Sequence, residues 1–232
     1  MTVQSVAASR STPFGYVCRR CNLCCRHKHI QLNPYEVARL ARAKGESTGQ
    51  FRAAWTVDGL GTTLRQKEDG TCVFLGPEGC EVHADRPLVC RLYPLGQHVR
   101  QDGSEYYTRL EGHPQSQGEF TNDGTIADYL AAQGATPFLD AADHYFQWLC
   151  AAHERFALTS DAPAASVGEA VDDVDLTDID QMIARYCTAT GEPEPDHLDD
   201  RMHLHLRLLD RAIANLEAAD DEQTPEARMP TA

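Results

Sequence analysis

Four cysteines fall within one octapeptide, Cys18-Arg-Arg-Cys21-Asn-Leu-Cys24-Cys25. Three more follow at Cys72, Cys80 and Cys90, so that seven of the nine cysteines lie in the first ninety residues. Thiolates spaced two residues apart along a short loop can converge on one soft ion or on an iron–sulfur core. The sequence therefore predicts a small cysteine-rich domain that binds a metal.

A disulfide framework is the main alternative, because cysteines at fixed spacings in small secreted chains usually form disulfides. The cysteine count is odd, and Met1 to Thr12 lack the pattern of an export signal. We therefore expect a cytoplasmic location, where reducing conditions keep thiols available for metal. No stretch approaches the roughly 18 apolar residues of a transmembrane helix, so we expect no membrane association.

The formal net charge of -14 is unevenly distributed. Residues 1–110 contain 15 Lys and Arg and 10 Asp and Glu, whereas residues 111–232 contain 6 and 25. The acidic total argues against a nucleic-acid partner, since such binding depends on neutralising phosphates. Basic residues lie within four positions of the candidate ligands, and some of them are expected to balance thiolate charge: Arg19, Arg20, Arg26, Lys28, Arg86 and Arg91.

The chain as a whole is predicted to be α+β. We expect a flexible N-terminus over residues 1–15, a metal-binding domain with short strands and a β-hairpin over residues 16–118, an acidic α-helical region over residues 119–219, and a disordered tail over residues 220–232. The acidic region is the candidate surface for a protein partner.

Within the metal-binding domain, Asn33, Pro34 and Glu36 predict a capped helix that runs to Lys44 and ends at Gly45. Further elements are expected at 30–32 (strand), 47–55 (helix), 64–67 and 72–75 (strands), 86–90 (helical turn carrying Cys90), and 95–100 with 106–110 (hairpin). A tight turn at 76–79 is expected to place Cys72 and Cys80 on two arms of a hairpin-like element.

The acidic region shows amphipathic helical periodicity at 125–133, 137–156, 178–187 and 197–218, with Thr136, Thr177 and Asp196 as expected amino-terminal caps. Residues 158–174 have the composition of a linker. Cys150 and Cys187 lie on these helices, and we expect them to be buried packing thiols.

Cys18, Cys21 and Cys24 have the two-residue spacing of ferredoxin ligands, but the same spacing also occurs in zinc knuckles. Adjacent side chains diverge, so Cys24 and Cys25 are not expected to bind the same single ion. The seven thiols exceed what one tetrahedral zinc uses, which favours a polynuclear cluster or two sites. The candidate metal ligands are Cys18, Cys21, Cys24, Cys25, Cys72, Cys80 and Cys90, with His83 and His113 as further candidates.

Several motifs occur together in the order typical of one family: the CxxCxxCC run, Cys72-Val-Phe-Leu75, Cys80-x2-His83 and Arg86-Pro87-x2-Cys90-Arg91-x-Tyr93-Pro94. Over residues 16–118 the chain resembles the YkgJ-type cysteine-cluster family of CxxCxxCC zinc- or iron-chelating domains. The resemblance implies a metal-chelating domain, and its best-known relative by domain content is flagellin lysine N-methylase. Members commonly carry Cys-Pro-Gly after the hairpin, where this chain has His113-Pro114-Gln115, so His113 either replaces a thiol ligand or is no ligand.

Three functions follow as hypotheses. The first is an iron–sulfur protein with a redox or cluster-dependent role, including that of an oxidoreductase. The second is a non-enzymatic zinc module whose acidic helices bind another protein. The third and weaker one is a protein-modifying enzyme similar to the lysine methylase. The chain has no phosphate-binding glycine loop and no serine nucleophile elbow, so the sequence assigns no catalytic residue.

Overall fold

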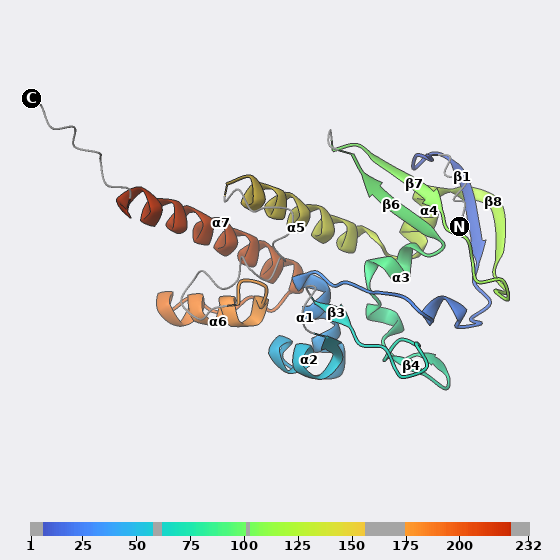
Figure 1. Ribbon diagram of the computed structural model, residues 1–232, viewed down its shortest axis with the longest axis horizontal. Helices are drawn as coiled ribbons and strands as arrows, with labels where there is room; N and C mark the ends of the chain where they lie inside the picture. The colour runs from blue at the N-terminus through green and yellow to red at the C-terminus, as the bar shows by residue number, and fades with distance from the viewer. Residues whose placement is uncertain (1–6, 58–61, 101–102, 156–174, 224–232) are drawn as a thin grey trace, which may run out of the picture. The chain divides into compact units, whose positions relative to one another are not determined.

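The computed structural model describes residues 7–57, 62–100, 103–155 and 175–223. The chain divides into two compact units, residues 1–142 (unit 1) and 143–232 (unit 2). The expected boundary between cysteine-rich and helical parts was residue 118, so unit 1 also includes the first helical residues of the acidic region. Helices combine with short antiparallel strand pairs, which confirms the α+β class (Figure 1).

Unit 1 contains the strands and the short helices of the described chain. In order they are β1 (Pro13–Val17), η1 (Leu23–Cys25), α1 (Pro34–Lys44), α2 (Thr48–Trp55), β2 (Thr56–Val57), β3 (Thr63–Leu64), β4 (Leu75–Gly76), β5 (Gly79–Cys80), η2 (His83–Asp85), α3 (Leu88–Leu92), β6 (Leu95–Val99), β7 (Glu105–Arg109), β8 (Glu119–Thr125) and α4 (Ile126–Ala132). The helix α5 (Thr136–Arg155) begins in unit 1, and α6 (Ile179–Thr190) and α7 (Leu198–Gln223) lie in unit 2.

Helix α1 begins and ends where the sequence predicts. The Asn33 side chain accepts the Glu36 N–H at 2.9 Å, and the Glu36 carboxylate accepts the Asn33 N–H at 3.0 Å, which completes a capping box. Gly45 ends the helix with φ at 70°, a conformation that glycine adopts without strain. A second capping box, between Ser47 and Gln50, starts α2.

The strands β1 and β8 are separated by about a hundred residues in the chain, yet they pair antiparallel (Figure 1). Gly15 lies opposite Thr121, and Val17 lies opposite Glu119. The segment expected to be flexible, residues 1–15, thus contains the start of a paired strand. Ala8 also pairs with Tyr107 through two backbone hydrogen bonds.

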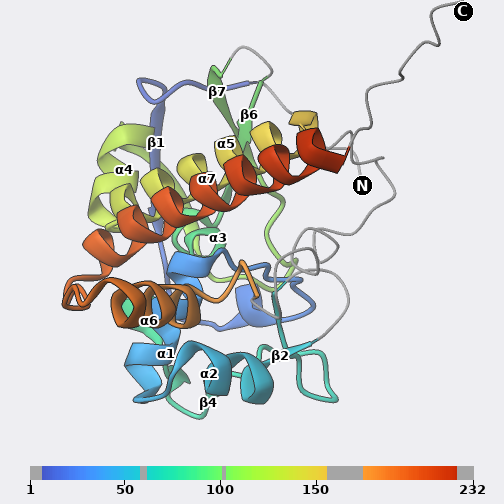
Figure 2. The same cartoon turned by 90° about the vertical axis from the view of Figure 1, so that its left-hand side faces the viewer.

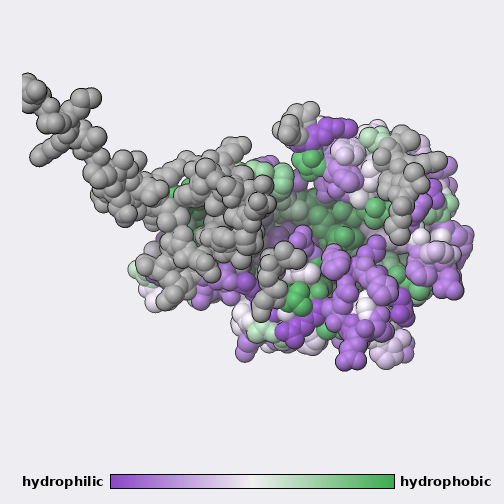
Figure 3. Space-filling model, viewed as in Figure 1, coloured by the Kyte–Doolittle hydropathy of each residue, from purple (hydrophilic) through white to green (hydrophobic). Residues whose placement is uncertain are grey.

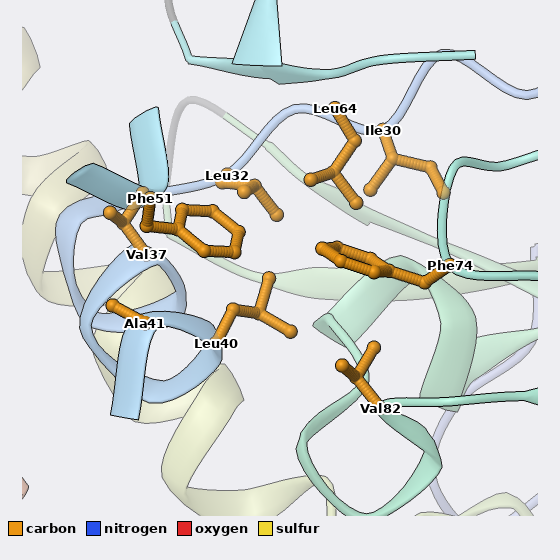
Figure 4. Close-up of a cluster of buried hydrophobic side chains, with 9 residues drawn as sticks. All are labelled: Ile30, Leu32, Val37, Leu40, Ala41, Phe51, Leu64, Phe74 and Val82. Atoms are coloured by element: carbon orange, nitrogen blue, oxygen red, sulfur yellow. The ribbon is translucent and has the colours of Figure 1, made fainter. Parts of the chain in front are cut away.

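Two apolar clusters form the core of unit 1. The first, which we call the α1–α2 cluster, comprises Ile30, Leu32, Val37, Leu40, Ala41, Phe51, Leu64, Phe74 and Val82. Figure 4 shows the rings of Phe51 and Phe74 pointing toward one another, with Leu40 beside both; the two rings stack at a centroid distance of 6.0 Å. The second, the β1–α4 cluster, comprises Phe14, Leu92, Leu95, Tyr107, Ile126, Leu130, Ala135 and Leu139.

The hairpin expected at 95–110 is present, because β6 and β7 pair from Leu95 opposite Arg109 to Val99 opposite Glu105. The strand expected at 30–32 is reduced to a single bridge between Gln31 and Thr63. The strands expected at 64–67 and 72–75 are also shorter, with β3 ending at residue 64 and β4 beginning at residue 75. Between these short strands the two segments still pair through the antiparallel bridge between Gln66 and Cys72.

Unit 2 is helical, and its core contains a buried histidine. Tyr145 Oη lies 2.9 Å from His205 Nδ1, and His205 Nε2 lies 2.9 Å from the Leu176 carbonyl oxygen. Asp178, and not the expected Thr177, caps α6 by accepting the Gln181 N–H at 3.1 Å, because the Thr177 hydroxyl is bonded to Asp175. Figure 2 shows α6 and α7 from a second direction.

The two unit 2 cysteines differ in burial. Cys187 is buried as expected, but Cys150 is exposed, so its assignment as a packing thiol is wrong.

The expected linker at 158–174 lies outside the described residues. Of the expected tail at 220–232, residues 224–232 also lie outside them, whereas residues 220–223 belong to α7, which continues to Gln223.

In the view of Figure 3, hydrophilic residues predominate over the part of unit 1 that carries α2 and β4. Among the described helices, none combines the length and the apolar character needed to cross a bilayer.

Candidate metal centre

The seven candidate cysteines come from four segments of unit 1. Cys18 follows β1, and Cys21 precedes the short helix η1, which carries Cys24 and Cys25. Cys72 lies in the loop before β4, Cys80 ends β5, and Cys90 lies in α3. Cys72 is therefore not on a strand, although the β4–β5 hairpin does present Cys80 as expected. All seven thiols are free.

Five of the thiols, which we call the inner set, are linked by electrostatic effects among them: Cys24, Cys25, Cys72, Cys80 and Cys90. The charge of Cys24 also raises the pKa of Cys21, so this influence extends to one thiol outside the set. Burial raises the pKa of the Cys90 thiol, and the charges of Cys72, Cys80 and Cys24 raise it further. Burial likewise raises the pKa of Cys80 and of Cys72. The inner set thus concentrates sulfur atoms whose negative charges repel one another unless a cation lies among them.

Three inner thiols rest on the core. Cys72, Cys80 and Cys90 are half-buried and pack against the α1–α2 cluster. The Cys24–Cys25 segment is attached to the same region, since the Cys72 N–H donates to the Cys25 carbonyl at 2.8 Å. The His27 N–H also donates to the Gly70 carbonyl at 2.7 Å. Backbone pairing therefore brings two distant cysteine segments together.

Cys24 and Cys25 form an asymmetric pair. The Cys25 thiol donates a hydrogen bond that lowers the pKa of Cys24 to about 7, with burial opposing and the Lys28 ammonium assisting. The same bond, together with burial, raises the pKa of Cys25. Cys24 is accordingly the member of the pair that more readily becomes a thiolate, the form that binds metal.

Cys18 and Cys21, which we call the outer pair, have different surroundings. Cys18 is exposed, and Cys21 is half-buried beside the loop that precedes β8. The backbone N–H of Gln117 donates to the Cys21 sulfur and lowers the pKa of Cys21. The Ser116 hydroxyl also lies 4.0 Å from this sulfur.

Four cysteines share one local geometry, in which the sulfur accepts the backbone N–H two residues farther along the chain. The Arg20 N–H lies 3.4 Å from the Cys18 sulfur. The other donors are Leu23 to Cys21, Phe74 to Cys72 and Val82 to Cys80. Arg20 and Asn22 have φ near 52° and 60°, and this left-handed backbone belongs to the tight turns of the octapeptide. Such N–H groups stabilise an anionic sulfur and hold it in place.

The charges of nearby cations act to lower the pKa of three thiols. Lys28 does so for Cys24, Arg86 for Cys80, and Lys67, which was not among the expected cations, for Cys72. Arg91 has another role. Its guanidinium donates to the carbonyls of residues 84, 86 and 133 at 2.5, 2.9 and 2.8 Å. Arg91 therefore has a structural role, and its share in balancing thiolate charge stays a prediction.

The two histidine candidates lie at the surface. The exposed His83 faces Arg86, with 3.5 Å between Nδ1 and Nη1, and burial together with the Arg86 charge lowers its pKa. The exposed His113 accepts the Gln115 N–H at its Nδ1, at 3.2 Å. Neither interaction involves a cysteine, so the structure adds no support for these imidazoles as ligands.

In the part of the chain that the structure describes, no three or more His, Cys, Asp or Glu side chains have the arrangement of a preformed metal site. The ligand assignment therefore stays a prediction. The donor chemistry nevertheless fits a soft metal, because thiolates are the ligands that zinc, copper(I) and iron–sulfur clusters prefer.

In a comparison with known families, the chain matches a model named CxxCxxCC and described as a "Putative zinc- or iron-chelating domain". Residues 17–117 match this model. We call this matched segment the CxxCxxCC domain. The matched segment contains all seven candidate cysteines and ends just before β8. No curated protein and no solved structure is significantly similar to the chain.

The CxxCxxCC domain contains positioning residues that the sequence did not reveal. Ser116 lies 95 positions from Cys21, and Gln117 follows it. Neither belongs to a motif, so no local signal could have found them. Glu36 is recognisable as a capping residue, but its second contact is not. Its carboxylate also accepts the Leu88 N–H at 2.7 Å, which fixes the start of the helix that carries Cys90.

Proposed function

We propose that the CxxCxxCC domain binds its metal through cysteine thiolates and that the bound group is an iron–sulfur cluster with a redox or cluster-dependent role. The observation that carries this proposal is the set of four N–H groups directed at sulfur atoms, in a domain whose inner thiols crowd together. A neutral thiol is a weak acceptor, whereas a thiolate or metal-bound sulfur forms charge-assisted hydrogen bonds.

The hydrogen bonds to sulfur support a cluster. The five inner sulfurs are sufficient for the four cysteine ligands of an iron–sulfur cluster, and hydrogen bonds to sulfur are one of the means by which proteins set the potential of such a cluster. When bound, such a cluster would supply one-electron chemistry. The inner cysteines would hold it, and Lys28, Lys67 and Arg86 would balance its charge. One side of the bound group would face the α1–α2 cluster, on which Cys72, Cys80 and Cys90 pack.

Zinc is the second candidate, and a specific observation favours it. The turns after Cys18 and Cys21, in which the sulfur accepts the N–H two residues on, are also the geometry of a zinc knuckle. In that case the domain would be a structural module. The acidic helices would bind a protein with a basic surface, since exposed carboxylates occur along α7 at Asp199, Asp200 and Asp210.

A protein-modifying activity similar to that of the lysine methylase is the weakest of the three. Neither the sequence nor the described residues offer a group that we can assign to methyl transfer. It remains a proposal on the ground of the sequence resemblance alone.

Purification without oxygen distinguishes the first two candidates. The full chain is analysed for iron, zinc and acid-labile sulfide, and its absorption spectrum is recorded. A brown protein with iron and stoichiometric sulfide is the result expected for the cluster. A colourless protein with one or two zinc ions supports the structural module instead. A protein that contains neither metal when isolated in the reduced state contradicts both.

A further inference from the structure

The seven cysteines are not equivalent, and the difference follows the two apolar clusters of unit 1. Cys72, Cys80 and Cys90 pack on the α1–α2 cluster, and Cys24 and Cys25 are attached to them by the hydrogen bond between the Cys72 N–H and the Cys25 carbonyl. The inner set is therefore attached to the α1–α2 cluster.

The outer pair is attached to a different part. Cys21 contacts Ser116 and Gln117, just before β8. Between the two cysteines, the Arg19 guanidinium forms an ion pair at 2.9 Å with Glu119, the first residue of β8. The strand β8 pairs with β1, whose Phe14 belongs to the β1–α4 cluster. The contacts that fix Cys18 and Cys21 thus belong to the β1–β8 sheet.

The outer pair also has the local form of a metal-binding turn. Both sulfurs accept the backbone N–H two residues on, and the cysteines are separated by two residues. Two thiolates in this geometry provide half of a tetrahedral site. The exposure of Cys18 leaves the remaining positions open to water or to thiols of another molecule.

We infer that the CxxCxxCC domain has two metal sites of different strength: a tight site formed by the inner set alone, and a weaker, exchangeable site for a soft ion at Cys18 and Cys21. This inference rests on the proposed metal-binding function. Binding at each site replaces thiol protons, which pass to solvent, by the incoming ion.

Cobalt(II) titration tests the inference, because the thiolate-to-cobalt charge-transfer absorption grows with the number of thiolates bound. Co²⁺ is added without oxygen to the full-length, reduced and metal-free chain. The wild type is expected to bind in two steps. The variant C18S/C21S keeps the first step with unchanged absorption per ion and loses the second. The variant C72S/C80S loses the first step, with affinity reduced by at least about 100-fold.

The matched control is C150S/C187S, which removes two thiols of unit 2 and is expected to leave both steps unchanged. A single step in the wild type would overturn the inference, as would a first step that C18S/C21S weakens tenfold or more. A wild type without any charge-transfer absorption would contradict the proposed function itself, so the two failures are distinguishable.

Alkylation of the wild type tests the same inference without any variant, so the result does not depend on whether a variant folds. With one equivalent of Zn²⁺ bound, iodoacetamide is expected to modify Cys18 and Cys21 before Cys72, Cys80 and Cys90, and mass spectrometry locates the modified residues. Protection of the outer pair equal to that of Cys72, Cys80 and Cys90 would overturn the separation into two sites.

Discussion

The Glu36 carboxylate, in the first turn of α1, accepts the backbone N–H of Leu88 at the start of α3, with 2.7 Å between Oε1 and N. The other carboxylate oxygen accepts the N–H of Asn33. Glu36 is only 4% exposed, and burial raises its pKa. One buried side chain thus holds the amino termini of two helices together, and the second of these helices carries Cys90.

Glu36→Ala is predicted to lower the free energy of unfolding of unit 1 by about 2–4 kcal/mol, because two buried N–H groups lose their acceptor. Glu36→Gln keeps one carbonyl-type oxygen and removes the buried charge, so its cost is expected to be about 1 kcal/mol. Urea unfolding measures both. The exposed Glu68→Ala is the control, with a change within about 0.5 kcal/mol. Equal losses for Ala and Gln at position 36 would refute the double-cap interpretation.

Arg91→Lys is predicted to cost at least about 2 kcal/mol, although it preserves the charge. The guanidinium donates to three carbonyls and lies with its carbon 4.0 Å from the centroid of the Phe138 ring. An ammonium cannot reach the three acceptors in one geometry, so buried carbonyls lose their donors. Chemical denaturation compares this variant with the exposed Arg42→Lys. Similar stabilities of the two variants would show that the carbonyl contacts contribute little.

Gly79→Ala is predicted to lower the free energy of unfolding by about 1–3 kcal/mol, because Gly79 has φ at 110°, which side-chain-bearing residues rarely adopt. The residue precedes Cys80 in the β4–β5 turn, so the strain acts directly on the segment that presents an inner thiol. The exposed neighbour Glu78→Ala is the control. The thermal unfolding midpoints of both variants are compared with that of the wild type. An unchanged midpoint for Gly79→Ala would mean that the turn does not need this backbone conformation.

His205 makes the stability of unit 2 depend on pH. The Leu176 carbonyl can only accept, so His205 Nε2 carries the proton and the Tyr145 hydroxyl donates to Nδ1. Burial lowers the pKa of His205 from 6.5 to about 4. Because the folded pKa is depressed, the unfolded chain takes up the proton first. The contribution of neutral His205 is therefore complete above pH 6.5 and is lost as the pH falls toward 4.

The predicted loss is about 3 kcal/mol over this interval, from 2.5 pKa units at about 1.36 kcal/mol each. Amide hydrogen exchange in α7 measures it, as the difference between the wild type and His205→Gln at pH 7 and pH 4. That difference is expected to shrink in acid. The exposed His197→Gln should show no comparable change. A difference between wild type and His205→Gln that stays constant with pH would exclude His205 as the group that titrates.

Local signals predicted local structure well. The capping box at Asn33 and the stop at Gly45 are determined by residues a few positions apart, and α1 follows them. The same holds for the β6–β7 hairpin and for the helical turn that carries Cys90. In each case the residues whose pattern predicts the element lie within the element or next to it in the sequence.

Long-range pairing could not be predicted in this way. The strand β8 has the sequence Glu119-Phe-Thr-Asn-Asp-Gly-Thr125, which is polar and lacks apolar alternation, and its partner β1 lies about a hundred residues away. Cys21 contacts residues just before β8, so the pairing of β8 with β1 helps to position it. The sequence therefore could not predict the difference in surroundings between the outer pair and the inner set. Spacing identified the cysteines but did not indicate which of them share surroundings.

X-ray absorption at the metal edge of the natively isolated chain tests the central claim most directly. We predict a first shell composed of sulfur, at about 2.3 Å as in zinc and iron thiolate sites. The shell should be unchanged in Cys187→Ser and lost with the metal in the variant C72S/C80S. A first shell of nitrogen and oxygen atoms, or a reduced chain that retains no metal, would contradict the claim that these cysteines bind one.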